Sequence, residues 1–157
     1  MPPWTQRAGY YSMKILALDI GEKRTGVACG DTVSKTALPI STIDTREMLK
    51  SPQKLKAVAE EHQVEMLLVG LPVSLDGQEN SQAERVRELA DRIAQILVLP
   101  LVFQDERLSS AEAKRFLREA GYTERQMRGK IDMIAASLVL QTYLDLAQGE
   151  GRGMAQL

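Results

Sequence analysis

The chain has 157 residues, a length that suits one domain with a hydrophobic core. Its composition, 44% hydrophobic and 26% charged, is typical of a globular protein, and no apolar run approaches the roughly 18 residues that a membrane span needs. A formal net charge of −1 argues against a protein that coats nucleic acid through bulk electrostatics. The single cysteine, Cys29, excludes an internal disulfide and lies in an apolar stretch, so we expect a buried thiol and a reducing, cytoplasmic compartment.

The two ends of the chain differ in composition from its middle. Residues 1–12 lack a basic segment followed by an apolar one, so we expect an N-terminal extension and not a signal peptide. Residues 148–157 are rich in glycine and are expected to form a disordered tail. Between them, residues 13–147 contain no repeat and no linker, which predicts a single domain.

The first part of this domain predicts three antiparallel strands. Residues 14–19 form a nearly continuous apolar run, as expected for a central strand that is covered on both faces. Gly21 turns the chain, and residues 25–30 return as a second strand. A third strand follows at roughly residues 35–43, where Pro39 indicates an edge position or a bulge.

The rest of the domain alternates helices with two more strands. Polar capping residues before apolar residues at helical spacing predict helices that begin near Ser51 and Pro52, at Ser81, at Ser109 and at Ile131. Buried strands are expected at residues 64–70 and 101–104. Helical crossovers make these strands parallel, so the pattern predicts an α/β fold. Its mixed five-stranded sheet has three antiparallel strands followed by two parallel strands, with helices on its flanks.

Acidic residues stand at three places where a carboxylate would reach one edge of this sheet. Asp19 is the only acid in the first apolar strand, and Asp105 and Glu106 end the last strand. Asp132 lies in the first turn of the final helix. Open α/β sheets bind ligands at the carboxyl ends of their strands. Carboxylates gathered there repel one another unless a hard cation such as Mg²⁺ or Mn²⁺ holds them, and such a site can hydrolyse phosphodiesters.

These acids also have plain structural explanations. Asp19 could form a salt bridge with Lys23 or Arg24 in the following turn, and an acid at a helix start is favourable for the helix dipole. Side chains alternate along a strand, so only one of Asp105 and Glu106 can face a given side. The sequence alone leaves that choice open.

Two further segments are compatible with nucleic-acid binding. Residues 107–130 carry seven basic and three acidic side chains, which indicates either a solvated helix face or a docking surface. The loop at residues 70–77 could present backbone N–H groups to phosphate, or it could be a plain Asp-Gly turn. His62, the only histidine, has no evident partner for a metal site or a catalytic triad.

Four motifs together resemble those of the YqgF (RuvX) family, whose RNase H-like fold is related to Holliday junction resolvases. They are residues 19–28, residues 69–72 with 76–77, residues 105–109, and residues 130–132 with 135–136. In order and spacing they cover nearly all of residues 14–146. The resemblance implies an RNase H-like nuclease domain in which Asp19, Glu106 and Asp132 bind Mg²⁺ or Mn²⁺. Asp105 is the alternative candidate for the position given to Glu106.

The resemblance also implies a substrate. The family is linked to trimming of the 5′ end of pre-16S rRNA, so we expect structured RNA as the partner, within a pre-ribosomal particle, and no membrane. Lys23, Arg24 and Arg107 are expected to contact backbone phosphates, and Lys130 the scissile phosphate. Junction resolvases carry a second acid three residues further along the last helix, where this chain has Ala135. Cleavage of branched DNA by a homodimer is therefore the less favoured alternative.

Two other classes of protein share some of these features. Nucleotide-binding modules of the actin and Hsp70 type also begin strands with Asp-x-Gly, but they need two lobes, and 157 residues supply one. A non-catalytic ribosome-assembly factor would use the basic segment 107–130 only to dock on rRNA. Stabilisation by Mg-ATP would indicate the first class, and acids that are dispensable in cells would indicate the second.

Overall fold

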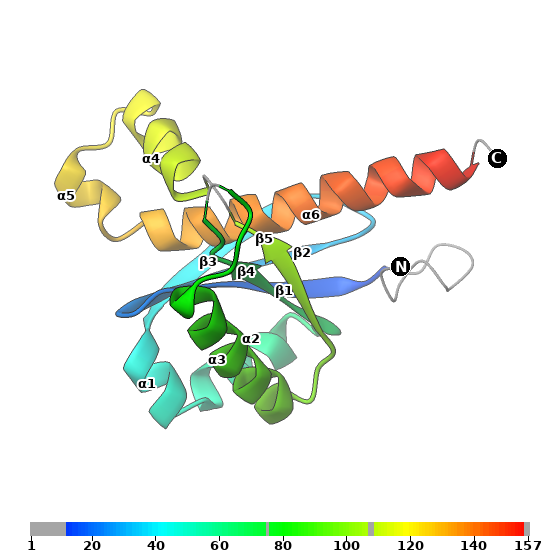
Figure 1. Cartoon of the computed structure of the whole chain (residues 1–157), viewed down its shortest axis with the longest axis horizontal. Helices are drawn as coiled ribbons and strands as arrows, with labels where there is room; N and C mark the ends of the chain where they lie inside the picture. The colour runs from blue at the N-terminus through cyan, green and yellow to red at the C-terminus, as the bar shows by residue number, and fades with distance from the viewer. Residues whose placement is uncertain (1–11, 75, 107–108, 156–157) are drawn as a thin grey trace.

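Five strands form one mixed sheet in the computed structural model, which describes residues 12–74, 76–106 and 109–155 (Figure 1). The strands are β1 (Lys14–Ile20), β2 (Arg24–Asp31), β3 (Ala37–Asp44), β4 (Met66–Leu71) and β5 (Leu101–Asp105), in the spatial order β3-β2-β1-β4-β5. The first three are antiparallel neighbours, whereas β4 runs parallel to β1 and β5 parallel to β4. The expected mixed five-stranded sheet is confirmed.

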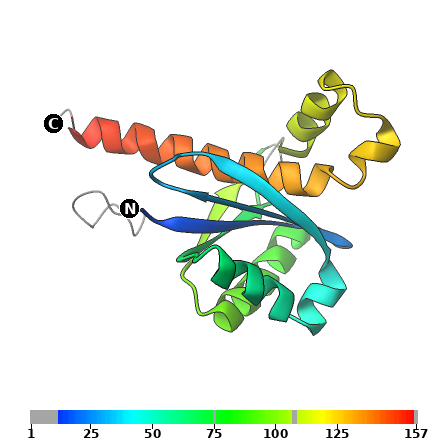
Figure 2. The ribbon, with the colours of Figure 1, turned by 180° about the vertical axis from the view of Figure 1, so that it is seen from behind.

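Helices cover both faces of this sheet (Figures 1 and 2). They are α1 (Thr45–Lys50), α2 (Gln53–Glu61), α3 (Ser81–Leu97), α4 (Ser109–Glu119), α5 (Glu124–Met127) and α6 (Ile131–Ala155). The first three lie on one face, and α6 crosses the other, where it packs on β1, β2 and β3. The pair α4 and α5 projects beside the start of α6 (Figure 1).

Alternation along β1 divides the core into two apolar clusters. Leu16, Leu18 and Ile20 face α2 and α3 and belong to what we call the α3-side core. Ile15 and Ala17 point the other way and pack with residues of α6, in what we call the α6-side core. Both faces of β1 are therefore buried, which explains its nearly continuous apolar sequence.

Two helix starts differ from the expected ones. The N-cap of α3 is Asn80, whose Oδ1 accepts the Ala83 N–H at 3.1 Å, so the expected cap at Ser81 is wrong by one residue. Pro52 takes the N-cap position of α2 without a side-chain cap, and Ser51 instead ends α1, with its N–H donating to the carbonyl of Glu47. Neighbouring polar residues have similar capping preferences, so local sequence alone does not separate them.

The short helices are also absent from the sequence-based expectation. α5 is held by a capping box in which the Thr123 hydroxyl accepts the Gln126 N–H and the Gln126 side chain accepts the Thr123 N–H. The expectation for β3 fares better, because Pro39 lies on an edge strand next to a register shift between β2 and β3. The side chain of Ser109, an expected helix cap, lies outside the described residues.

The two expected terminal segments are described only in part. Residues 1–11 and 156–157 lie outside the described residues. α6 continues to Ala155 and so enters the segment 148–157, for which composition predicts a disordered tail. Within residues 12–74, 76–106 and 109–155, no helix combines the length and the apolar character that crossing a membrane requires.

Candidate active site

Asp19 lies near the carboxyl end of β1, on the face that α6 covers. It follows Ile15 and Ala17 at alternate positions, and both of those residues belong to the α6-side core. Its partner in the antiparallel register is Gly26 on β2. The carboxylate therefore stands where the apolar lining of this face ends.

Glu106 reaches the same point from the end of β5. Its N–H donates to the carbonyl of Leu71 at 3.2 Å, which fixes the main chain beside β4. A Cβ placed on Gly70 would lie 2.5 Å from Glu106 Oε2, so the glycine leaves the space that this side chain occupies. The side chains of Glu106 and Asp19 share a hydrogen bond. Asp105, by contrast, is exposed at the last position of β5.

The contact between the two carboxyl groups requires a proton. Burial, followed by the hydrogen bond and the charge of Asp19, raises the pKa of Glu106 to about 10, with a smaller contribution from Asp105. Glu106 is accordingly protonated at neutral pH when no cation is bound. The proton reduces the same repulsion that a divalent cation would neutralise. Of the two acids between which sequence left the choice open, Glu106 is the one whose side chain hydrogen-bonds to Asp19.

Asp132 completes the group from the first turn of α6. A Cβ on Gly26 would lie 1.8 Å from the carbonyl oxygen of Asp132, so the start of the helix rests directly on the glycine of β2. Burial raises the pKa of Asp132, and so does the charge of Asp19, while Arg24 opposes both. Arg24 Nε lies 3.1 Å from Asp132 Oδ2. The salt bridge that sequence suggested between Arg24 and Asp19 is thus formed with Asp132 instead.

These residues suit a divalent cation, although they are not closed around one. Asp19 and Glu106 supply adjacent, half-buried oxygen donors of the type that Mg²⁺ and Mn²⁺ prefer, and the third acid is close enough to repel Asp19. Within the described part of the chain, no three His, Cys, Asp or Glu side chains are already arranged as a metal site. Asp132 is turned onto Arg24, whose Nε donates to its Oδ2.

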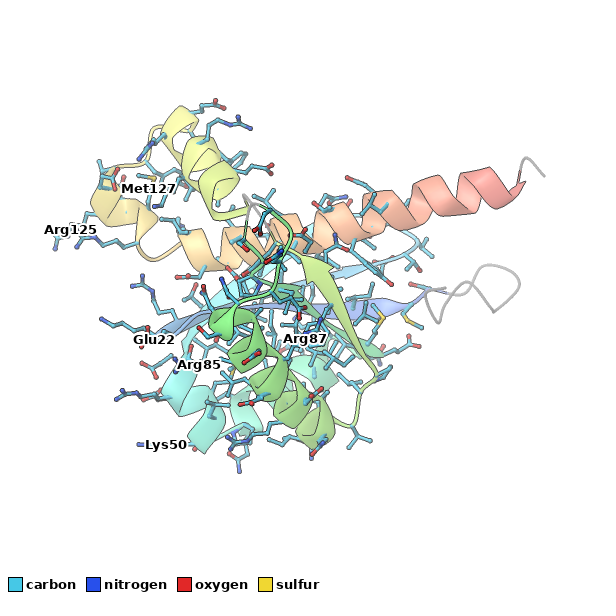
Figure 3. All side chains as sticks on the ribbon, viewed as in Figure 1. Glu22, Lys50, Arg85, Arg87, Arg125 and Met127 are labelled. Carbon is cyan, nitrogen blue, oxygen red and sulfur yellow. The ribbon has the colours of Figure 1, made fainter. Side chains whose placement is uncertain are left out.

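Of the basic residues expected to contact phosphate, the structure describes all except Arg107. Lys23 is exposed in the turn between β1 and β2, next to Arg24. Lys130 Nζ lies 5.6 Å from the centroid of the Tyr122 ring, immediately before α6. Arg107 lies outside the described residues. Arg125, on the projecting α5, points away from the sheet (Figure 3).

The loop after β4 offers less to a phosphate than its sequence suggests. The N–H groups of Ser74 and Gly77 donate to the carbonyls of Gln78 and Ser74, and the N–H of Gln78 donates to Asp76 Oδ1. These donors are satisfied within the loop. The contacts favour the plain turn over the phosphate cradle.

A cleft of about 420 Å³ opens at the same edge of the sheet, on the α3 side. It lies between the turn after β1 and the first turns of α3, and Glu22 and Arg85 stand at its two walls (Figure 3). Sequence patterns do not reveal this cleft, because its walls come from segments about 60 residues apart that only the fold brings together. Gly70 and Gly26, which leave room for Glu106 and Asp132, both belong to the matched motifs. The sequence alone does not show which residues fill the space beside them.

Comparisons with known proteins agree with these features. A family model described as "RuvX: Holliday junction resolvase" matches residues 13–146. A protein of Thermosynechococcus vestitus named "Putative pre-16S rRNA nuclease" is 41% identical over 133 residues, which are 85% of this chain and 88% of that protein. A protein of the same name from an Anaeromyxobacter species is 38% identical over 133 residues, covering 85% of this chain and 97% of its own length.

Two solved structures share the fold at low sequence identity. RuvC of T. thermophilus, in complex with a Holliday junction substrate, gives a TM-score of 0.53 with 13% identity and covers 87% of this chain and 96% of its own. The resolvase of Fowlpox virus with Holliday junction DNA gives 0.54 with 12% identity, covering 86% and 99%. These likenesses show the RNase H-like fold. The family match over residues 13–146 and the relative that is 41% identical show that this chain belongs to the RuvX family.

Proposed function

We propose that this chain is a divalent-cation-dependent nuclease that hydrolyses phosphodiester bonds of structured RNA, in the processing of the 5′ end of pre-16S rRNA. The observation that carries the proposal is the half-buried contact between Glu106 and Asp19, with Asp132 beside them. Such a group is unfavourable in a protein that has no use for it, because among the described residues the two partly desolvated carboxyl groups have no cationic partner. The name shared by the relatives supplies the substrate.

The acids have distinct roles in this proposal. Asp19 lies against Glu106 and close enough to Asp132 for its charge to act on it, so the three acids would together hold the divalent ions of a two-metal site. Bound Mg²⁺ or Mn²⁺ would supply a water nucleophile at neutral pH and stabilise the leaving 3′ oxygen. Glu106 must lose its proton before it can act as a ligand, since a protonated carboxyl is a poor donor to a hard cation.

Basic residues around the acids would hold the substrate. Lys23 and Arg24 project from the turn that follows Asp19, and Lys130 immediately precedes α6. Arg107 has the corresponding place after Glu106. Each would contact a backbone phosphate, with Lys130 nearest the scissile one, and so position the chain across the acids. We place the reaction in the cytoplasm, on a pre-ribosomal particle.

The alternative of junction cleavage is favoured by one specific observation, the description of the matching family model. Against it stands Ala135, an apolar and fully buried residue at the position where junction resolvases are expected to carry a further acid. A resolvase also needs two copies to cut two strands symmetrically. A mass measurement in solution with and without a four-way junction tests this requirement. The third candidate, a non-catalytic rRNA-binding factor, predicts that the acids are dispensable in cells.

The direct test uses the two neighbouring acids at the end of β5 as a matched pair. The full chain is incubated with labelled pre-16S rRNA and with a four-way DNA junction, each with and without Mn²⁺. We expect cleavage of the RNA that requires Mn²⁺ and is lost in Asp19→Asn and Glu106→Gln. Asp105→Asn, which alters an exposed side chain outside the contact, should keep most of the activity.

Thermal unfolding of each variant controls for folding. Cleavage retained by a folded Asp19→Asn variant would rule out this site. Loss of activity in Asp105→Asn with Glu106→Gln unaffected would exchange the roles of the two acids. Cleavage of the DNA junction alone would favour the resolvase alternative.

A further inference from the structure

The third acid of the site is occupied by a cation from the protein itself. Arg24 Nε donates to Asp132 Oδ2 at 3.1 Å, across a separation of 108 residues in sequence. In this arrangement the Asp132 carboxylate is directed at a guanidinium and does not join Asp19 and Glu106. A cation that is to take Asp132 Oδ2 together with the other two acids must therefore compete with Arg24.

The main chains on both sides of this ion pair are fixed. Arg24 begins β2, where it pairs with Asp44 of β3, and its carbonyl accepts the Gly21 N–H at 2.9 Å. The Asp132 main chain rests against Gly26 with no room for a single additional carbon atom. Any rearrangement is consequently confined to the two side chains.

The two side chains differ in their exposure to solvent. The Arg24 side chain is 55% exposed, whereas that of Asp132 is 21% exposed. An incoming phosphate can thus reach the guanidinium without entering the site, while the carboxylate stays covered. An ion pair that is half open to water is weak, and guanidinium binds phosphate through paired, charge-assisted hydrogen bonds. A phosphate is therefore a strong competitor for Arg24.

We propose that Arg24 is a positioning residue that couples nucleic-acid binding to cation binding. In the free protein its guanidinium holds Asp132 away from the other acids. A backbone phosphate of the substrate takes over the guanidinium, and Asp132 is then released to complete the cation site. This inference rests on the proposed function, because it assumes that Asp19, Glu106 and Asp132 hold the cation.

The coupling has a consequence that is independent of catalysis. Because linkage is reciprocal, an RNA that releases Asp132 must strengthen cation binding by the same factor by which the cation strengthens RNA binding. The free protein would hold cations weakly, and the full site would form only on substrate. A simple structural tether between β2 and α6 predicts neither effect.

The test measures Mn²⁺ binding to the full chain by the loss of the electron paramagnetic resonance signal of free Mn²⁺. Titrations are run in the cold with and without a short RNA oligonucleotide, which a gel shows to be uncut at the end. For the unaltered chain we expect the RNA to tighten Mn²⁺ binding by about tenfold or more. In Arg24→Gln, which keeps a long polar side chain but removes the charge, Mn²⁺ should bind the free protein more tightly than in the unaltered chain. Added RNA should then change that affinity little.

Two further variants separate coupling from general charge effects. Lys23→Ala removes the neighbouring exposed cation, so it should weaken RNA binding yet leave the RNA-dependent gain in Mn²⁺ affinity in place. Arg24→Lys, which keeps a positive charge, should restore part of the coupling. Equal loss of the gain in Lys23→Ala and Arg24→Gln would reduce the effect to bulk charge and overturn the proposal.

The proposal also fails if Arg24→Gln lowers the melting temperature while Mn²⁺ affinity and its response to RNA stay unchanged, because Arg24 is then only a tether. Asp19→Asn distinguishes this failure from failure of the proposed function. If Asp19→Asn loses Mn²⁺ while Arg24→Gln behaves as the unaltered chain, the cation site stands and the coupling falls. If Asp19→Asn binds Mn²⁺ at full affinity, the acids do not hold the cation and both proposals fall.

Discussion

The two faces of the sheet end differently at the same edge. On the α3 side, apolar side chains continue to the last residues of β1 and β4, where Ile20 and Leu71 are only 5% and 7% exposed. On the α6 side, the apolar lining of β1 stops at Ala17, and the edge is formed by Asp19 and Glu106. One strand therefore contributes a core residue and a candidate ligand at adjacent positions.

This difference separates two demands that often conflict. The α3-side core can stabilise the fold up to the edge of the sheet, because the buried hydroxyls of Thr25 and Thr45 at that edge hydrogen-bond to each other. On the α6 side, half-buried acids take the place of apolar side chains at the edge. Without a cation, this arrangement is unfavourable for stability. We therefore expect substitutions on the α3 side to change mainly the free energy of unfolding. Substitutions of the acids on the α6 side should change mainly cation or RNA binding.

The largest effect on stability is expected from Leu18→Ala, on the α3 side. Leu18 is fully buried and lies next to Asp19 in β1. Removing most of its side chain should lower the free energy of unfolding by about 2–5 kcal/mol, because a cavity replaces apolar contacts. Chemical denaturation measures the loss. Cleavage per folded molecule should persist below the melting transition, and its disappearance in a fully folded variant would contradict the separation of the two faces.

Gly26→Ala tests the place where the two demands meet. The new methyl group would lie 1.8 Å from the Asp132 carbonyl oxygen and 2.8 Å from the Met133 nitrogen, and neither of these backbone atoms can rotate away. The start of α6 must then shift, at a cost of about 1–3 kcal/mol, typical of overpacking. Because Asp132 moves with the helix, Mn²⁺ binding in the presence of RNA should weaken as well. Unchanged stability in denaturation experiments would show that the helix start is looser than this contact implies.

The sequence predicts the acids better than it predicts their partners. The apolar run of β1 identifies Asp19 as an exception within a buried strand, and alternation then assigns its face relative to Ile15 and Ala17. Local pattern cannot decide between Asp105 and Glu106. The decision depends on where β5 ends and on the register that sets Leu71 opposite Asp105. That register is set by tertiary packing.

Local sequence patterns predict the contact between Arg24 and Asp132 even less well. The two residues are 108 positions apart, and either could have paired with a closer charge. The sequence offered Lys23 or Arg24 as an alternative partner for Asp19 because these residues are close together in the chain. In the fold, Arg24 pairs with Asp44 of β3, and α6 packs against β2. Proximity in sequence was a poor guide because antiparallel pairing and the position of α6 decide which charges meet.

The dependence of the free energy of unfolding on pH provides a further test of the acids on the α6 side. The pKa of Glu106 is raised from 4.5 to about 10, so the folded chain keeps a proton that the unfolded chain releases. Its stabilising contribution is complete below about pH 4.5 and is lost as the pH rises towards 10. The raised pKa of Asp132 acts with the same sign. In EDTA, we expect the free energy of unfolding to fall by on the order of 1 kcal/mol between about pH 6 and about pH 8.

Glu106→Gln provides the control, because its amide cannot titrate, and the fall should shrink in this variant. Saturating Mn²⁺ should also reduce the fall, since the cation displaces the proton from Glu106. Stability that rises with pH over this interval in EDTA would contradict the protonated contact. A fall of equal size in Glu106→Gln would assign it to other groups.

The smallest effect on stability is expected from Gly70→Ala, which crowds the site as Gly26→Ala does but against a different kind of atom. The new methyl group would lie 2.5 Å from Glu106 Oε2, the far end of a flexible side chain, which can turn aside. Its crowding should be offset by the smaller freedom of alanine in the unfolded chain, so the free energy of unfolding should change by less than about 1 kcal/mol. Turning Glu106 aside separates it from Asp19, however, so Mn²⁺ affinity and RNA cleavage should both fall while the melting temperature holds. A stable Gly70→Ala protein with full Mn²⁺ affinity would mean that Glu106 does not need this position, and the comparison of the two glycines would then no longer locate the cation site.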